Sequence, residues 1–154
     1  AVICQSLLRR YGVVFRAVIQ RETLLPPWRE LLQYFRRMED RGEVHGGRFV
    51  DGFSGEQFAL PEALGLLRQP VEANGRGVFT VISACDPLNL GGLIVPGAKT
   101  PATAANRILL ENGLPVARML GDELEEFPGI SPQVSREAHS RLPVVKHWKG
   151  RSTG

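Results

Sequence analysis

The sequence has few of the features that would assign it to a chemical class. It has 2 cysteines among 154 residues, with no CxxC pair, and no glycine pattern of a phosphate-binding loop. These absences argue against a zinc finger, a disulfide framework and a P-loop nucleotide site. No apolar run approaches the roughly 18 residues of a membrane-spanning helix, and residues 1–6 lack the basic start of a signal peptide. We therefore expect a cytoplasmic protein with no metal site and no membrane partner.

Lysine is also scarce, because arginine outnumbers it sixteen to three. Arginine suits bidentate phosphate contacts, although GC-rich coding produces the same bias. The net charge of +3 is unevenly distributed: residues 1–41 hold eight arginines and four acids, residues 42–60 one arginine and three acids. A basic tail runs from Arg136 to Gly154. The first residue is Ala, so we expect this chain to be the end of a longer protein.

The stretch 28–61 is the most informative part of the chain. An apolar stripe at helical spacing comes first, formed by Trp28, Leu31, Leu32, Phe35 and Met38. Gly42 ends this helix, and two strands over 43–50 and 57–60 follow it, with Gly46-Gly47 marking a bulge or a close backbone approach. A helix followed by a hairpin is how a winged helix-turn-helix ends, and such a module can bind nucleic acid with both parts.

The segments before and after this stretch complete the first domain. Residues 1–11 read as a helix ended by Gly12, and 13–22 as a second helix because Val14, Phe15, Val18 and Ile19 have helical spacing. A short helical connector over 62–69 precedes a linker over 70–77. We predict a winged-helix domain over 1–68.

Residues 69–154 have a different texture, with short apolar runs separated by Gly, Pro and Asn turns. We expect strands over 78–84, 90–95, 107–110 and 115–120, with Asn112-Gly113 as a hairpin turn. The predicted core residues are Val78, Val81, Leu93, Ile94, Ile108, Leu110 and Val116. This pattern favours a small β-barrel-like domain with a basic C-terminal tail. The predicted fold class is therefore α+β.

The candidate nucleic-acid contacts are basic or amide side chains. Arg29, Gln33, Arg36 and Arg37 share one helix face opposite Trp28, for which a solvated surface is the alternative. The full predicted set is Arg29, Gln33, Arg36, Arg37, Arg41, Arg48, Lys146 and Lys149. Among the acids, Asp86 follows an apolar strand and is a weak catalytic candidate, with a turn-capping aspartate as the alternative. Asp122–Glu126 is expected to be a solvated face or turn.

Three runs resemble the C-terminal region of the large helicase-related (Lhr) proteins: LLRRYGVVFRAVI, PPWRELLQYFRRMEDRGEVHGGRFVDGFSGEQFALP and ISACDPLNLGGLIVPG. The resemblance extends over roughly Leu7 to Val116. It implies the last winged helix and the terminal barrel of a DNA-dependent ATPase and helicase associated with DNA repair. The ATPase motor, with its ATP and Mg²⁺, would lie outside this chain, so no cofactor is expected in it.

The resemblance leaves three functional hypotheses. The first is a DNA-binding and scaffolding region of the helicase, whose partners are DNA and the neighbouring winged-helix and helicase domains. The second is a uracil-type DNA glycosylase module, since excision has been linked to some family members; the segment from Lys146 to Gly154 contains no acid, which argues against it here. The third is a module that joins copies of the helicase into a homo-oligomer.

Overall fold

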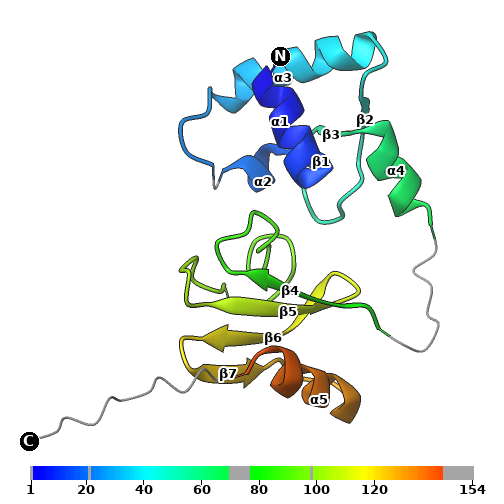
Figure 1. Ribbon diagram of the computed structural model, residues 1–154. Coiled ribbons are helices and arrows are strands. Elements are labelled where there is room, and N and C mark those ends of the chain that lie inside the picture. The colour runs from blue at the N-terminus through cyan, green and yellow to red at the C-terminus, as the bar shows by residue number, and fades with distance from the viewer. Residues whose placement is uncertain (1, 21, 70–76, 98, 144–154) are drawn as a thin grey trace, which may run out of the picture. The chain divides into compact units, whose positions relative to one another are not determined.

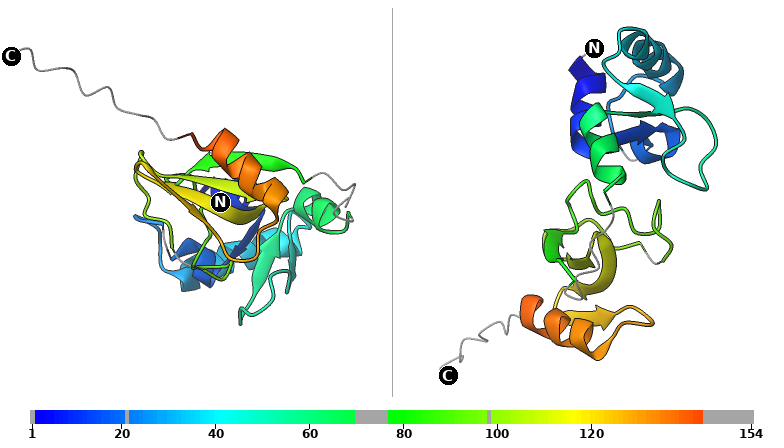
Figure 2. Two further views of the ribbon diagram at one scale, coloured as in Figure 1. Left: turned by 90° about the horizontal axis from the view of Figure 1, so that it is seen from below. Right: turned by 90° about the vertical axis from the view of Figure 1, so that its right-hand side faces the viewer.

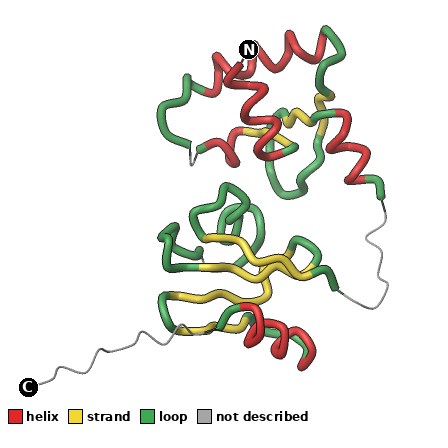
Figure 3. The backbone as a smooth tube through the Cα atoms, in the orientation of Figure 1, coloured by secondary structure: helices red, strands yellow, loops and turns green. Residues whose placement is uncertain are grey.

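The computed structural model describes residues 2–20, 22–69, 77–97 and 99–143. It divides into two compact units, Ala1–Glu72 and Ala73–Gly154, and each is described by itself (Figure 1; Figure 3). Both units combine helices with an antiparallel sheet, so the predicted α+β class is confirmed. Within the described ranges, no helix has the length and apolar character that crossing a bilayer requires.

The first unit begins with α1 (Val2–Tyr11), which ends at Gly12 as predicted. Gly12 has a φ of 72°, and its amide donates to the Leu8 carbonyl oxygen at 2.7 Å. The chain then forms β1 (Val13–Phe15) and the four-residue helix α2 (Arg16–Ile19). The prediction of one helix over 13–22 is therefore wrong. Its first residues pair with a distant strand instead, and this tertiary pairing overrides the helical spacing.

The helix and hairpin predicted from the 28–61 stretch are present. They are α3 (Trp28–Asp40), β2 (His45–Gly47) and β3 (Gln57–Ala59), followed by α4 (Pro61–Leu67). Both hairpin strands are shorter than predicted. The ladder stops after Gly47 because the next backbone amides are bonded to a side chain, that of Gln57, rather than to the opposite strand.

The sheet of the first unit has the order β1-β3-β2, with all pairs antiparallel. Phe58 lies at its centre, opposite Val14 on one side and Gly46 on the other. The Phe35 ring of α3 stacks on the Phe58 ring, with the centroids 5.1 Å apart, and both residues are fully buried. The element order α1-β1-α2-α3-β2-β3 is that of a winged helix, in which residues 48–56 form the wing loop.

The second unit contains an antiparallel sheet of the order β4-β5-β6-β7. Its strands are β4 (Phe79–Ser83), β5 (Arg107–Glu111), β6 (Leu114–Leu120) and β7 (Glu123–Glu126). Asn112 and Gly113 have positive φ values of 50° and 84°, which two-residue hairpin turns require, so the predicted turn is confirmed. The described strands form an open sheet with β4 and β7 as its edges, so "barrel-like" describes this unit loosely.

A helix that the sequence analysis did not predict, α5 (Pro132–Arg141), lies across one face of this sheet (Figure 2). The Ser131 hydroxyl accepts from the Val134 amide at the start of α5, and Pro132 occupies its first turn. The helix and sheet share one buried cluster, formed by Leu109, Ala117, Met119, Ala138 and Leu142. The first part of the predicted basic tail is therefore a packed helix.

Several further predictions for the second unit are wrong. Residues 90–95 form a tight turn rather than a strand, because the amides of Leu93, Ile94 and Val95 all donate to the Leu90 carbonyl oxygen. The strand β4 is not buried, since it is an edge strand: Val78 beside it is 69% exposed and Val81 is 37% exposed. Of the predicted core residues, Ile108 is buried, whereas four are only half-buried: Leu93, Ile94, Leu110 and Val116. The acidic segment predicted as a solvated face or turn supplies the strand β7, in which three of the four residues are exposed.

Candidate nucleic-acid interface

The exposed face of α3 is set by the residues that α3 buries. Leu31, Phe35 and Met38 are at most 3% exposed, and they fix the rotation of the helix against the sheet. The opposite face then points to solvent, and it carries the four predicted contact residues Arg29, Gln33, Arg36 and Arg37, all of which are exposed. The geometry thus brings these four together, while their binding of nucleic acid stays a prediction.

One of these arginines is already engaged by an acid from the wing. Arg36 donates from Nε to Glu56 Oε1 at 3.0 Å and from Nη2 to Glu56 Oε2 at 2.7 Å. These hydrogen bonds and the carboxylate charge raise the pKa of Arg36 above its ordinary value. Because Glu56 directly precedes β3, the pair links α3 to the end of the wing loop. A phosphate that contacts Arg36 has to displace this carboxylate or share the guanidinium with it.

The predicted contact Arg41 is also paired, at the end of α3. Its Nε donates to Glu43 Oε1 at 2.5 Å, and this hydrogen bond lowers the pKa of the Glu43 carboxyl group. Both side chains are about half exposed, at 54% and 40%. Arg41 is therefore held at the turn that follows the helix, whereas Arg29, Gln33 and Arg37 lie along the helix itself.

Three predicted arginines have no acid partner among the described residues: Arg29, Arg37 and Arg48. The Arg37 guanidinium lies over the ring of Tyr34, with 5.8 Å between Cζ and the ring centroid. Arg48 is the first residue of the wing loop and lines two hollows, one with Phe49 and Phe53 and one with Glu39 and Glu56. These three guanidiniums are the ones most available to phosphates.

The wing is held close to the end of α3. The amide of Gly46 donates to Glu39 Oε1 at 3.1 Å, and a Cβ atom at this position would lie only 2.4 Å from that oxygen. At Gly47 a Cβ would lie 2.8 Å from the Phe49 ring. Both glycines therefore allow a close approach, as the Gly46-Gly47 pair led us to expect. The wing also contacts β1, because the Phe53 ring lies against the Phe15 ring at a centroid distance of 4.9 Å.

The charge of this surface is more balanced than the arginine face alone suggests. Residues 28–60 hold five arginines against six acids, which gives a net charge of −1. Four of these acids have described partners: Glu39, Glu43, Asp51 and Glu56. No local pattern in the sequence predicts the pairing of Glu56 with Arg36 or the hydrogen bonds of the Gln57 side chain. Both residues lie in the GEQ run that contributes to the family resemblance. The predicted contacts Lys146 and Lys149 lie outside the described residues.

The structure places Asp86 in a turn. Its Oδ1 accepts from the Leu88 amide at 2.8 Å, and its carbonyl oxygen accepts from the Asn89 amide at 2.9 Å. This geometry is that of an aspartate that caps a turn. The sequence left a catalytic base as the alternative role of Asp86. In the structure its carboxylate accepts a hydrogen bond from a backbone amide of the same turn.

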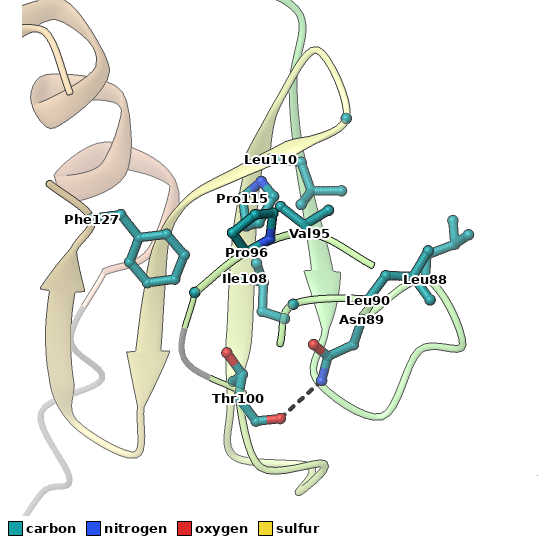
Figure 4. Close-up of a pocket in the computed structure, with 13 residues that line it drawn as sticks. Leu88, Asn89, Leu90, Val95, Pro96, Thr100, Ile108, Leu110, Pro115 and Phe127 are labelled. Atoms are coloured by element: carbon teal, nitrogen blue, oxygen red, sulfur yellow. Dashed lines mark hydrogen bonds between the residues drawn. The ribbon is translucent and has the colours of Figure 1, made fainter. Parts of the chain in front are cut away.

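The pocket near this turn is small and mostly apolar (Figure 4). It has a volume of about 50 Å³, well below the roughly 300–1,000 Å³ of a typical ligand site. Ile108, Leu110, Pro115 and Phe127 line it, and Asn89 closes one side with a hydrogen bond from Nδ2 to the Thr100 carbonyl oxygen at 3.0 Å. The lining includes no carboxylate. In the described part of the chain, no group of three or more His, Cys, Asp or Glu residues is placed to hold a metal ion.

Comparison with known proteins adds two findings. The family model of the large helicase-related protein winged-helix domain matches residues 1–78. A protein of Escherichia coli (strain K12), described as "Lhr helicase/uracil glycosylase", is 33% identical over 104 residues. That match covers 66% of this chain and 7% of the relative's length, so the chain corresponds to a small part of that protein.

Proposed function

This chain belongs to the large helicase-related (Lhr) family, and we propose that it serves as a nucleic-acid-binding accessory region of a helicase. The ATPase motor, with its ATP and Mg²⁺, belongs to another part of such a protein. The other domains of the same polypeptide and DNA are then the partners of this chain. We expect it to act in the cytoplasm, at the nucleoid, in DNA repair.

One observation carries this proposal: the exposed arginine face of α3 lies in a winged helix, next to the wing that carries Arg48. In winged helix-turn-helix proteins the third helix enters a groove, and the neighbouring elements contact the sugar-phosphate backbone. Arg29 and Arg37 would contact phosphates from the helix, and Arg48 from the wing. Gln33 lies between them on the helix, where an amide can bond to phosphates or base edges.

The balanced charge of the surface bears on the strength of binding. With a net charge of −1 over residues 28–60, the surface formed by α3 and the hairpin has little general attraction for DNA and depends on a few placed guanidiniums. We expect weak binding without sequence preference, with a Kd in the range of about 10⁻⁴ to 10⁻⁶ M near physiological salt. Such an affinity suits an accessory region, because a motor on the same polypeptide keeps the DNA close.

The test is a salt series with a short fluorescein-labelled DNA duplex and the matching single strand. Each lost phosphate contact flattens the plot of log K against log salt by about 0.9 for a duplex. We expect the double variant Arg29→Ala/Arg37→Ala to lose about two such contacts. Arg136→Ala/Arg141→Ala is the matched control, since it removes two exposed arginines from α5 of the second unit. Equal slopes for the double variant and the wild type would contradict the proposal.

A second candidate function rests on the edge strand β4. This strand contains no charged residue. Val81 in the strand, Val78 directly before it and Leu114 at the start of β6 are exposed. Exposed edge strands with these properties pair readily with other chains. Self-association through β4 would make the second unit an oligomerisation module. Light scattering of the wild type and a Val81→Lys variant would show whether any association depends on this edge.

A further inference from the structure

We infer that Gln57 is the positioning residue of the wing: its side chain fixes the wing loop and thereby the place of Arg48. The inference rests on the proposed function, since it assigns to Gln57 the preorganisation of a nucleic-acid contact. Gln57 itself is fully buried, so its side chain acts on the wing loop rather than on a ligand.

The Gln57 side chain uses all of its hydrogen-bonding capacity on the wing loop. Oε1 accepts from the Phe49 amide at 2.8 Å and from the Val50 amide at 2.7 Å. Nε2 donates to the Val50 carbonyl oxygen at 2.8 Å and to the Phe53 carbonyl oxygen at 3.4 Å. A flipped amide group would face two N–H donors with its NH₂ group, so the four contacts define the orientation of this side chain.

These contacts replace the strand pairing that the loop lacks. Residues 48–56 leave the hairpin ladder after Gly47, so their amides and carbonyls need other partners. Successive side chains of a strand point to opposite faces, which places Gln57 on the face opposite Phe58 and away from the Phe35 stack. The wing loop covers that face, and Gln57 becomes buried because the loop folds over it.

The position of Arg48 follows from these bonds. Arg48 directly precedes Phe49, and the Phe49 amide is held by Gln57 Oε1 while the Phe49 ring lies over Gly47. The backbone on both sides of Arg48 is therefore fixed before any ligand arrives. A loop ordered in advance loses less conformational entropy on binding, so its contacts contribute more to affinity. Loss of the Gln57 amide leaves up to four backbone groups to find water and frees the loop.

The experiment combines Gln57→Met with Arg48→Ala in the full chain. Methionine keeps the length and the apolar stem of glutamine, and it removes all four hydrogen bonds. Affinity for the short labelled duplex is measured for the wild type, both single variants and the double variant, across the salt series. Amide hydrogen exchange at Phe49 and Val50 is measured without DNA, with thermal unfolding to confirm that each variant is folded.

We expect Arg48→Ala to remove one phosphate contact. Taking no difference from the wild type at 1 M salt as the reference, this loss weakens binding by roughly 15-fold at 50 mM salt. Gln57→Met alone should cause a loss of similar size, and adding Arg48→Ala to it should weaken binding by less than about threefold more, because the two changes disable the same contact. Exchange at Phe49 and Val50 should accelerate at least about tenfold in Gln57→Met. If Gln57 only stabilised the fold, the losses of affinity from Gln57→Met and Arg48→Ala would be independent, and the double variant would show their product.

Two outcomes separate this inference from the proposed function. Absence of any duplex or single-strand binding by the wild type would overturn the proposed function. Unchanged exchange at Phe49 and Val50 in folded Gln57→Met, or multiplying losses in the double variant, would overturn the role of Gln57. If Gln57→Met does not fold, Gln57→Asn takes its place. It keeps an amide on a side chain one methylene shorter, which cannot reach all four partners, so the same pattern is expected with a smaller loss.

Discussion

The Glu56 carboxylate occupies Arg36, and we expect its removal to strengthen the proposed interaction with DNA. Glu56→Gln leaves an uncharged amide beside Arg36, while the two hydrogen bonds at 3.0 and 2.7 Å show how completely the carboxylate engages the guanidinium now. If the released arginine makes one new phosphate contact, the slope of log K against log salt steepens by about 0.9. Taking no difference at 1 M salt as the reference, affinity rises roughly 15-fold at 50 mM and roughly fourfold at 200 mM.

The assay is fluorescence anisotropy with the short duplex over that salt range. Glu62→Gln is the matched control: Glu62 is an exposed acid of α4 in the same unit, with no ion pair in the described part of the chain. It removes the same charge without releasing an arginine. Equal gains for Glu56→Gln and Glu62→Gln would refute the reasoning, because the effect would then come from net charge alone. A loss of affinity in Glu56→Gln would refute it also, by showing that the pair is needed to hold the wing.

Further predictions concern stability, pH and chemistry. Phe35→Ala removes the ring stacked on Phe58 and should lower the free energy of unfolding by about 3–5 kcal/mol in urea denaturation, whereas Tyr34→Ala, at an exposed position, should change it by less than about 1 kcal/mol. Because the pKa of folded Glu43 lies below its unfolded value, its contact with Arg41 stabilises the fold above about pH 4.3 and is lost as the pH falls through the folded pKa; unfolding of Glu43→Gln at a series of acidic pH values should therefore show a weaker pH dependence than the wild type. The purified chain should remove no uracil from single-stranded DNA, because Asp86 caps a turn and the pocket beside it is small and apolar. Strand cleavage after alkali treatment that disappears in the Asp86→Asn variant would contradict this prediction.

The winged helix could be predicted where the signals are local. The apolar stripe of α3, the glycine at its end and the glycine-rich hairpin lie within one stretch of sequence. Each of these elements is therefore visible in the residues that form it. The strand β1 could not be predicted in this way. Its three residues continue a helical pattern, and they become a strand only because Val14 pairs with Phe58, far along the chain. The pairing of Arg36 with Glu56, twenty residues apart, is likewise a product of the fold.

In the second unit, the helix α5 could be predicted from local sequence, whereas the strand β7 could not. A Ser-Pro start and the spacing of Val134, Ala138 and Leu142 predict a helix with one apolar face, and α5 has this form. The strand β7 has one apolar residue, Leu124, among acids, so its sequence resembles a solvated turn. Its place at the sheet edge depends on pairing with β6, including Arg118 opposite Glu125.

The most direct test of the nucleic-acid surface is an NMR titration of the ¹⁵N-labelled full chain with the short DNA duplex. The account predicts that the backbone amides of the α3 face and the wing shift together, with Arg29, Gln33, Arg37 and Arg48 among the most affected. The shifts should weaken as salt is raised, because they report phosphate contacts. Shifts confined to residues 77–143, with α3 and the wing unchanged at saturation, would contradict the central claim that the winged helix is the part of this chain that binds DNA.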